Sequence, residues 1–230
     1  MKTFNTSAKL LVGAVLVASG GMASALNIVL NPSFEDGQFD DKDVNSIAQV
    51  TQVGGGCGVD CSNTKIAFWT VSQTRPLIWI DNSYVGPLKT PYDKKFLDLT
   101  AYTNATTQYA TIGQNLGTTV NQPYTLTFSL GSSNVFGTLP VIVASAAGID
   151  VNFGVTTPPV AINNWTSFSF NFTPLTNSTA LSFTGLLGSD YIGLDNISVT
   201  AVPEPGTLAM LFAGLAAVGT VVARKRKQIG

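Results

Sequence analysis

The sequence predicts an all-β protein in which the middle of the chain folds as an antiparallel β-sandwich. Between residues 26 and 200, short runs of β-branched and aromatic residues are separated by Gly, Pro, Asn and Asp, with little helical periodicity. Two runs, 124–130 and 165–172, alternate apolar and polar side chains. Their polar positions hold Thr, Ser and Asn, which is typical of an antiparallel sheet with one face in water. We therefore expect one domain of about ten or eleven strands.

The two alternating runs define the clearest strands. Their apolar positions, which we expect to face the core, are Tyr124, Leu126, Phe128, Leu130, Phe168, Phe170 and Phe172. The other strands are expected at 47–53, 66–71, 77–80, 95–99, 108–112, 141–144, 149–155, 180–184 and 191–199. In the last of these, the apolar face switches at Asp195-Asn196. A β-bulge at this point would explain the switch and would turn Asp195 out of the normal pleat.

Residues 1–25 have the pattern of a secretory signal peptide. Lys2 and Lys9 are followed by a short run of apolar and small residues, which closes on Ala23-Ser24-Ala25. A membrane-spanning anchor would need about 20 apolar residues, and this run is roughly half as long. We expect cleavage after Ala25.

The C-terminal residues predict a short motif, one membrane-spanning helix and a basic tail. Residues 201–206 contain Val202-Pro203-Glu204-Pro205-Gly206, residues 207–223 are uncharged, and residues 224–230 begin with four consecutive cations. Seventeen helical residues span about 25 Å, just enough for a thin hydrocarbon core. The cations favour a cytoplasmic tail. The alternative is a helix buried in the core, but such a helix does not usually end in four cations.

This order of motif, apolar span and basic tail resembles the PEP-CTERM sorting signal of Gram-negative bacteria that make extracellular polysaccharide. The resemblance implies that an exosortase, a membrane enzyme, recognises Pro203, Glu204 and Pro205 and removes the span. The helix would then be a temporary membrane anchor. Two prolines hold the chain extended next to the bilayer, as a processing enzyme requires.

The middle of the chain is similar to the choice-of-anchor C proteins, to the plant cell-wall proteins of domain of unknown function 642, and more distantly to galactose-binding-like carbohydrate-binding modules. The motifs that carry this resemblance are Asn31–Gly37, Trp69, Ile78–Asp81, Phe96–Leu99, Tyr124–Leu130 and Leu194–Val199. It implies a jelly-roll sandwich at the cell surface or in the extracellular matrix, in contact with polysaccharide.

The galactose-binding-like resemblance also implies a structural calcium ion between the first and last strands. Glu35 and Asp195 are the positions that match. Calcium takes six to eight oxygen ligands, so other oxygens would be needed. The alternative is that both carboxylates accept hydrogen bonds from backbone amides at strand ends.

Cys57 and Cys61 lie in a glycine-rich stretch of a chain with an export signal. Two thiols in an oxidising compartment usually pair, so we expect a disulfide. A metal site or a redox motif is the alternative, although a redox pair would normally be spaced C-x-x-C.

Aromatic rings are the expected contacts for sugars, because a pyranose ring stacks its apolar face on them. Trp79, Tyr84 and Tyr92 are the candidates, and the polar insertion 81–95 is the expected contact surface. Trp69 and Trp165 lie in strand patterns, which favours the core for both. Residues 77–80 are all apolar, so the pattern fits Trp79 on either face of its strand.

Composition excludes several functions. The 230 residues include no His, so Ser-His-Asp or Cys-His catalysis and imidazole-bound zinc are excluded. The whole chain has 12 basic and 13 acidic residues, but residues 26–206 have 6 and 13, a formal charge of 6 − 13 = −7. Nucleic acid is therefore not an expected partner. We expect a polysaccharide-binding protein without catalysis. The alternatives are an adhesive structural protein and a polysaccharide-modifying enzyme.

Overall fold

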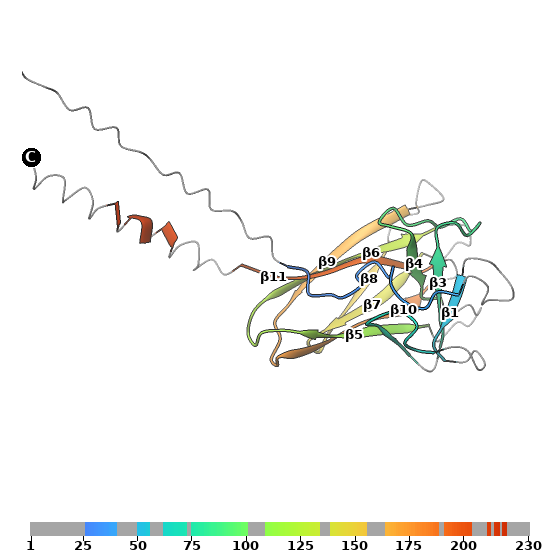
Figure 1. Cartoon of the computed structure of the whole chain (residues 1–230), viewed down its shortest axis with the longest axis horizontal. Coiled ribbons are helices and arrows are strands. Elements are labelled where there is room, and N and C mark those ends of the chain that lie inside the picture. The colour runs from blue at the N-terminus through green and yellow to red at the C-terminus, as the bar shows by residue number, and fades with distance from the viewer. Residues whose placement is uncertain are drawn as a thin grey trace, which may run out of the picture.

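The computed structural model describes residues 26–40, 50–55, 62–72, 75–100, 109–133, 139–155, 164–188 and 191–203, together with 211–212, 214–216 and 218–219. The strands form two antiparallel sheets packed face to face (Figure 1). This arrangement confirms the predicted β-sandwich.

The larger sheet has six strands in the order β1-β3-β4-β11-β6-β9. Their bounds are β1 Val50–Val53, β3 Leu77–Asp81, β4 Lys95–Asp98, β11 Gly193–Ala201, β6 Tyr124–Ser132 and β9 Asn164–Phe172. The smaller sheet has the order β2-β5-β10-β7-β8. Its strands are β2 Thr70–Val71, β5 Thr111–Gly117, β10 Ser178–Leu187, β7 Val141–Ala146 and β8 Ile149–Gly154.

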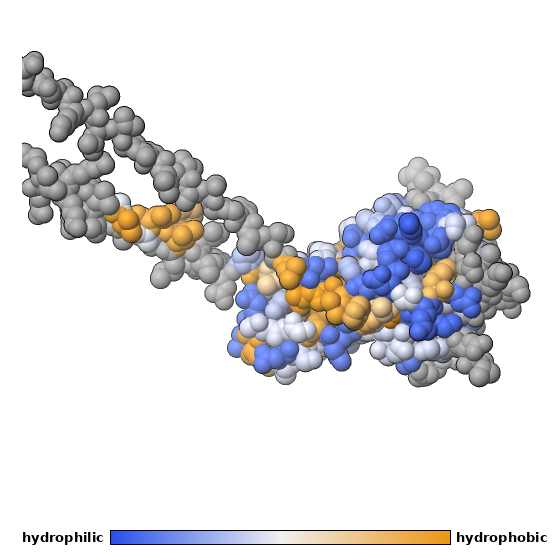
Figure 2. All heavy atoms as spheres, viewed as in Figure 1, coloured by the Kyte–Doolittle hydropathy of each residue, from blue (hydrophilic) through white to orange (hydrophobic). Residues whose placement is uncertain are grey.

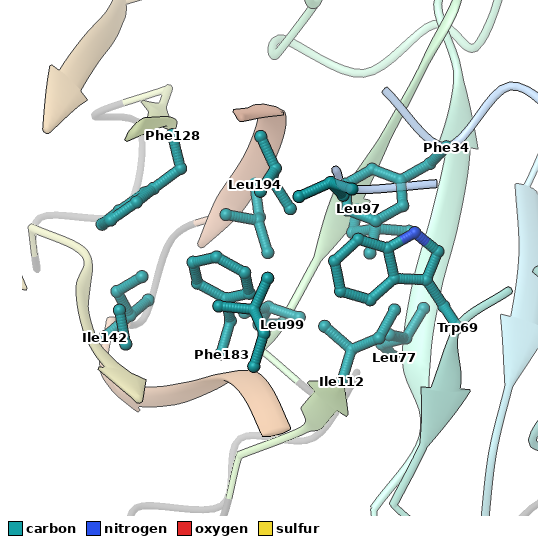
Figure 3. Close-up of a cluster of buried hydrophobic side chains, with 14 of the residues drawn as sticks. Phe34, Trp69, Leu77, Leu97, Leu99, Ile112, Phe128, Ile142, Phe183 and Leu194 are labelled. Atoms are coloured by element: carbon teal, nitrogen blue, oxygen red, sulfur yellow. The ribbon is translucent and has the colours of Figure 1, made fainter. Parts of the chain in front are cut away.

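The core lies between the inner faces of the two sheets. Phe128 on β6 faces Phe183 on β10, with ring centroids 5.2 Å apart, and Figure 3 shows the side chains of both sheets pointing toward one another. The predicted alternation of β6 and β9 is confirmed, since Phe128 pairs with Phe168 across the two strands. Among the described residues, the buried main core runs from Val29 to Val199, so residues 26–203 include both sheets and this core.

The segment before β1 is fixed against the last strand. Asn27 donates its amide to the Ile197 carbonyl and accepts from the Val199 amide, and the Ile28 amide donates to the Val199 carbonyl. Asn31 then organises a tight turn, because its amide donates to the carbonyls of Asp36 and Ala67. These contacts bring the motif that begins at Asn31 next to the motif that begins at Leu194.

The predicted bulge in the last strand is confirmed. The register of β11 against β6 shifts between Asp195 and Ser198, and Asn196 has a φ of 53°. A left-handed residue at this point is the usual device that lets one strand carry an extra residue. Leu194 and Ile197 are three residues apart, and the bulge lets both face the core while Asp195 faces outward.

Several predicted strands differ in their bounds from the observed ones, and two of these differences are informative. Only Thr70 and Val71 of the expected strand 66–71 are in a strand, because residues 66–69 form a turn closed by the Trp69 amide on the Ile66 carbonyl. β5 runs to Gly117, beyond the expected end at residue 112. Gly113 and Gly117 resemble turn residues in the sequence, but both are paired with β10.

The end of β11 leads directly into the C-terminal motif. The Val202 amide donates to the Pro123 carbonyl, and the Gln122 side chain donates to the Val202 carbonyl, at 2.9 and 2.8 Å. Pro203 is exposed. Residues 211–212, 214–216 and 218–219 are helical, and no helix among the described residues is long and apolar enough to cross a membrane.

Candidate functional site

Residues 82–94, which connect β3 to β4 and are here called the covering loop, fold over the outer face of the six-stranded sheet. Leu88 of this loop is buried and packs with four side chains from the outer face, which are Val50, Ile78, Ile80 and Phe96. The covering loop therefore forms a second, smaller core. Both faces of β3 are buried as a result, which explains why its sequence does not alternate.

The covering loop is fixed by hydrogen bonds along its length. The side-chain Nδ2 of Asn82 donates to the backbone carbonyls of Thr90 and Asp93, at 2.8 and 2.9 Å. Its Oδ1 accepts from the backbone amide of Thr90. The Trp165 indole on β9 donates to the Lys89 carbonyl at 2.6 Å. A loop fixed in this way holds its side chains in place before a ligand arrives.

Asp195 lies under the covering loop and is fully buried. Its carboxylate accepts a short hydrogen bond from the Thr90 hydroxyl and one of 2.6 Å from the Asn196 amide. Burial raises the pKa of Asp195 to about 7, although the two hydrogen bonds lower it. The negative charges of Glu35 and Asp93 add to the rise. The bulge thus places a carboxylate where its charged form is costly.

Glu35 fixes the other end of the covering loop. Its Oε1 accepts from the backbone amides of Lys94 and Lys95, at 2.9 and 2.7 Å, and its Oε2 lies 3.4 Å from the Lys95 ammonium. The two residues predicted to bind calcium therefore both contact the segment 90–95. Among the described residues, no group of three or more His, Cys, Asp or Glu is arranged to hold a metal.

Trp79 does not fit its predicted role as a sugar contact. Its side chain is fully buried, its indole donates to the Phe34 carbonyl at 2.9 Å, and its ring lies edge-on against Phe39 at 5.0 Å. A ring without exposed surface cannot stack on a sugar. Trp79 belongs to the core.

Tyr84 and Tyr92 are half-buried on the covering loop. Tyr92 lies edge-on to Trp165, which also contacts Phe96, with centroid distances of 5.9 and 5.7 Å. Trp165 covers Gly131, where a Cβ atom would lie only 2.7 Å from the indole ring. The described part of the chain thus gathers three half-exposed aromatic rings, those of Tyr84, Tyr92 and Trp165, on and beside a fixed loop.

Thr90 was not predicted as part of this site, and Trp165, for which the core was favoured, is half-exposed on the outer face. Trp165 had a signal in its pairing with Gly131, since a glycine opposite a Trp leaves room for the indole on the outer face. Thr90 had none, because its contact with Asp195 spans 105 residues. Cys57, Cys61, Glu204 and Pro205 lie outside the described residues.

Comparison with known proteins identifies the C-terminal motif. Residues 201–227 match the PEP-CTERM protein-sorting motif. The motif indicates export and sorting to the cell surface, and it implies processing by an exosortase. No curated protein matches the chain.

Solved structures similar to the chain include carbohydrate-binding modules. TmCBM61 in complex with β-1,4-galactotriose has 11% identity over 77% of this chain and 100% of that one, with a TM-score of 0.46. The CBM22-1 xylan-binding domain of Xyn10C from Paenibacillus barcinonensis has 12% identity over 66% and 90%, with a TM-score of 0.40. A family 35 module from Clostridium thermocellum has 13% identity over 58% and 92%, with a TM-score of 0.37.

Proposed function

We propose that the chain is a polysaccharide-binding protein that is exported, sorted by an exosortase, and active at the cell surface or in the biofilm matrix without catalysis. The observation that carries this proposal is the aromatic group of Tyr84, Tyr92 and Trp165 on the fixed covering loop. Rings held in place stack on sugars at little entropic cost. Polar neighbours on the loop, such as Asp93 and Lys94, can bind sugar hydroxyls.

The positions of the carboxylates support a non-catalytic role. A glycosidase needs two carboxyl groups on either side of the scissile bond, both accessible to substrate. Asp195 is fully buried, and one oxygen of Glu35 accepts from two backbone amides. Asp195 is therefore closed off from substrate by the covering loop, and Glu35 is engaged by the backbone of the loop's end.

The experiment for this proposal is a pull-down of residues 26–203 with a panel of insoluble polysaccharides. Replacing both Tyr84 and Tyr92 by Ala should weaken binding about ten-fold or more, because each ring contributes of the order of 1 kcal/mol. The matched control is Val85→Ala, which removes a fully solvated apolar side chain from the same loop, since Val85 is 93% exposed. Unchanged binding by the double variant would remove the covering loop from the proposal. Absence of binding together with self-association would favour an adhesive structural protein.

We also propose that residues 207–223 anchor the protein temporarily in the inner membrane of a Gram-negative cell, with residues 224–230 in the cytoplasm. The uncharged stretch and the four cations after it support this topology. Val202, which is hydrogen-bonded to Gln122 and Pro123, directly precedes Pro203, so we expect processing to occur beside the folded domain.

Mass spectrometry of the exported protein tests this sorting. We expect a mature form that begins after Ala25 and lacks the tail Arg224–Lys227. Replacing Pro203, Glu204 and Pro205 by Ala should leave the tail attached and the protein in the membrane fraction, whereas Ser169→Ala, an exposed change on β9, should not. An intact tail on the exported wild-type protein would contradict exosortase processing.

Calcium at Glu35 and Asp195 is a further part of the proposal. Its support is electrostatic: Glu35 and Asp93 lie close enough to raise the pKa of Asp195, so a cation between them would relieve the repulsion. The Thr90 hydroxyl is a neutral oxygen in the same place. Because no group of three or more His, Cys, Asp or Glu side chains is arranged for a metal in the described residues, carbonyl oxygens or water would have to complete the site.

A further inference from the structure

The outer face of the five-stranded sheet is hollowed along β5 and β10, on the opposite side of the sandwich from the covering loop. Outward positions on these strands carry small side chains, with Gly113 opposite Ser182 and Asn115 opposite Ala180. A hollow of about 600 Å³ lies here, between Thr70 on β2 and Ser182 on β10. We call it, together with its extension below, the β5–β10 trough.

A second hollow extends the first. It has a volume of about 260 Å³, is bordered by Ala147 and Leu175, and shares Ala180 with the first hollow. The two hollows therefore cross the sheet from β2 to the end of β7. Three inter-strand spacings of about 4.8 Å span roughly 14 Å, which is enough for about three sugar rings.

Phe68 lies at one end of the trough and is held in an unusual backbone conformation. Its side chain is 62% exposed, and its φ is 68°, the left-handed region that a bulky residue rarely adopts. It occupies the third position of the turn Ile66–Trp69, where glycine is favoured. An exposed ring kept in place against its backbone preference indicates a function that glycine could not perform.

Gln114 positions Phe68 and Leu30 at the edge of the trough. Its side chain is almost fully buried, and its Nε2 donates to the carbonyls of Leu30 and Phe68, both at 3.0 Å. Its Oε1 accepts from the Leu30 amide at 2.9 Å. Leu30 and Phe68 are both exposed, at 53% and 62%. Figure 2 shows that apolar residues gather in a band on the viewed face of the domain.

The chemistry of the lining specifies the ligand. Every residue that lines either hollow is uncharged, and the polar ones carry hydroxyl or amide groups, such as Thr70, Asn115, Ser178 and Ser182. An anion would gain nothing here, because residues 26–206 carry a formal charge of 6 − 13 = −7. A neutral chain with hydroxyl groups and apolar ring faces matches the lining.

We propose that the β5–β10 trough is a second glycan-binding site, which holds a neutral polysaccharide chain across the strands with Phe68 as its stacking ring. The ligand class rests on the proposed function, but the site is on the other sheet and uses none of the covering loop. Two sites on opposite faces would let one molecule cross-link two glycan chains.

Titration of ¹⁵N-labelled residues 26–203 with neutral oligosaccharides tests the trough. The probes are three- to six-unit oligomers of β-linked glucose, xylose, mannose and galactose. We expect shifts in the amides of Gly113, Asn115 and Ala180. Phe68→Gly should weaken binding there at least ten-fold without lowering the melting temperature, because glycine suits the turn. Ala180→Trp should abolish it by filling the point shared by both hollows.

Ser169→Trp is the matched control for Ala180→Trp, since Ser169 is an exposed strand residue on the opposite sheet. The trough proposal fails if the trough amides do not move with any probe, or if Phe68→Gly and Ala180→Trp bind as the wild type does. It also fails if the trough signals depend on protein concentration without sugar, which would identify a second copy of the chain as the occupant. Loss of binding only in the Tyr84 and Tyr92 variant would refute the trough and leave the proposed function standing.

Discussion

Asp195→Asn should raise the free energy of unfolding at pH 8 by about 2–4 kcal/mol when a chelator is present. The folded-state pKa of Asp195 is about 7 and its ordinary value is 3.8, so between these pH values the folded protein binds more protons than the unfolded chain. The stability that the protonated form contributes is complete below pH 3.8 and is lost as the pH rises through 7. Asn keeps an acceptor for the Asn196 amide and removes the charge.

Denaturant unfolding of the wild type and of Asp195→Asn from pH 4 to pH 8 measures this effect. The wild type should lose stability over this range, and the variant should lose less. Asp36→Asn is the matched control, because Asp36 is exposed and its replacement should change neither curve by much. A variant less stable than the wild type at pH 8 in chelator would show that the buried charge is not costly.

The same pair of proteins tests calcium. If calcium binds at Glu35 and Asp195, millimolar CaCl₂ should raise the melting temperature of the wild type and leave that of Asp195→Asn unchanged, because the ion binds only the folded state with both carboxylates. Equal melting temperatures of the wild type in calcium and in chelator would remove the calcium proposal, and the hydrogen-bonded role of both residues would remain.

Trp79→Ala should lower the free energy of unfolding by about 3–5 kcal/mol, through the cavity left in the core. Trp79→Phe should cost about 1–3 kcal/mol, because it fills most of the space but leaves the Phe34 carbonyl without its donor. Denaturant unfolding measures both. Since Trp79 is fully buried, Trp79→Phe should bind glycan like the wild type while it is folded. Lost binding at unchanged stability would return Trp79 to the ligand site.

The sequence predicted the parts of the fold in which one face of a strand is wet. β9, and β6 as far as Phe128, could be predicted from periodicity, because outer positions there, such as Thr127 and Ser169, meet water. The faces of β3 could not be assigned from periodicity, because the covering loop buries the outer face as well. In the sequence this loop looks like a polar insertion exposed to solvent. Leu88 is the only fully buried apolar residue of that loop, and one apolar residue is too little signal to predict the cover.

The candidate site was also predictable only where the signal lies within one strand. The switch of face in β11 predicted the bulge at Asp195, because a bulge changes the pattern within one strand. Phe68 had no comparable signal: in the sequence it continues an apolar run, and only the turn at Ile66–Trp69 brings it to the surface. Long-range contacts, such as that of Gln114 with Phe68, decide which aromatic rings are exposed.

The most direct test of the central claim is isothermal titration of residues 26–203 with a soluble form of the polysaccharide that the pull-down identifies, followed by mass spectrometry of the recovered sugar. The account predicts saturable binding and a polysaccharide recovered with unchanged length and substituents. New reducing ends or released acyl groups would show an enzyme, and no heat of binding with any polysaccharide of the panel would show that the domain does not recognise glycans.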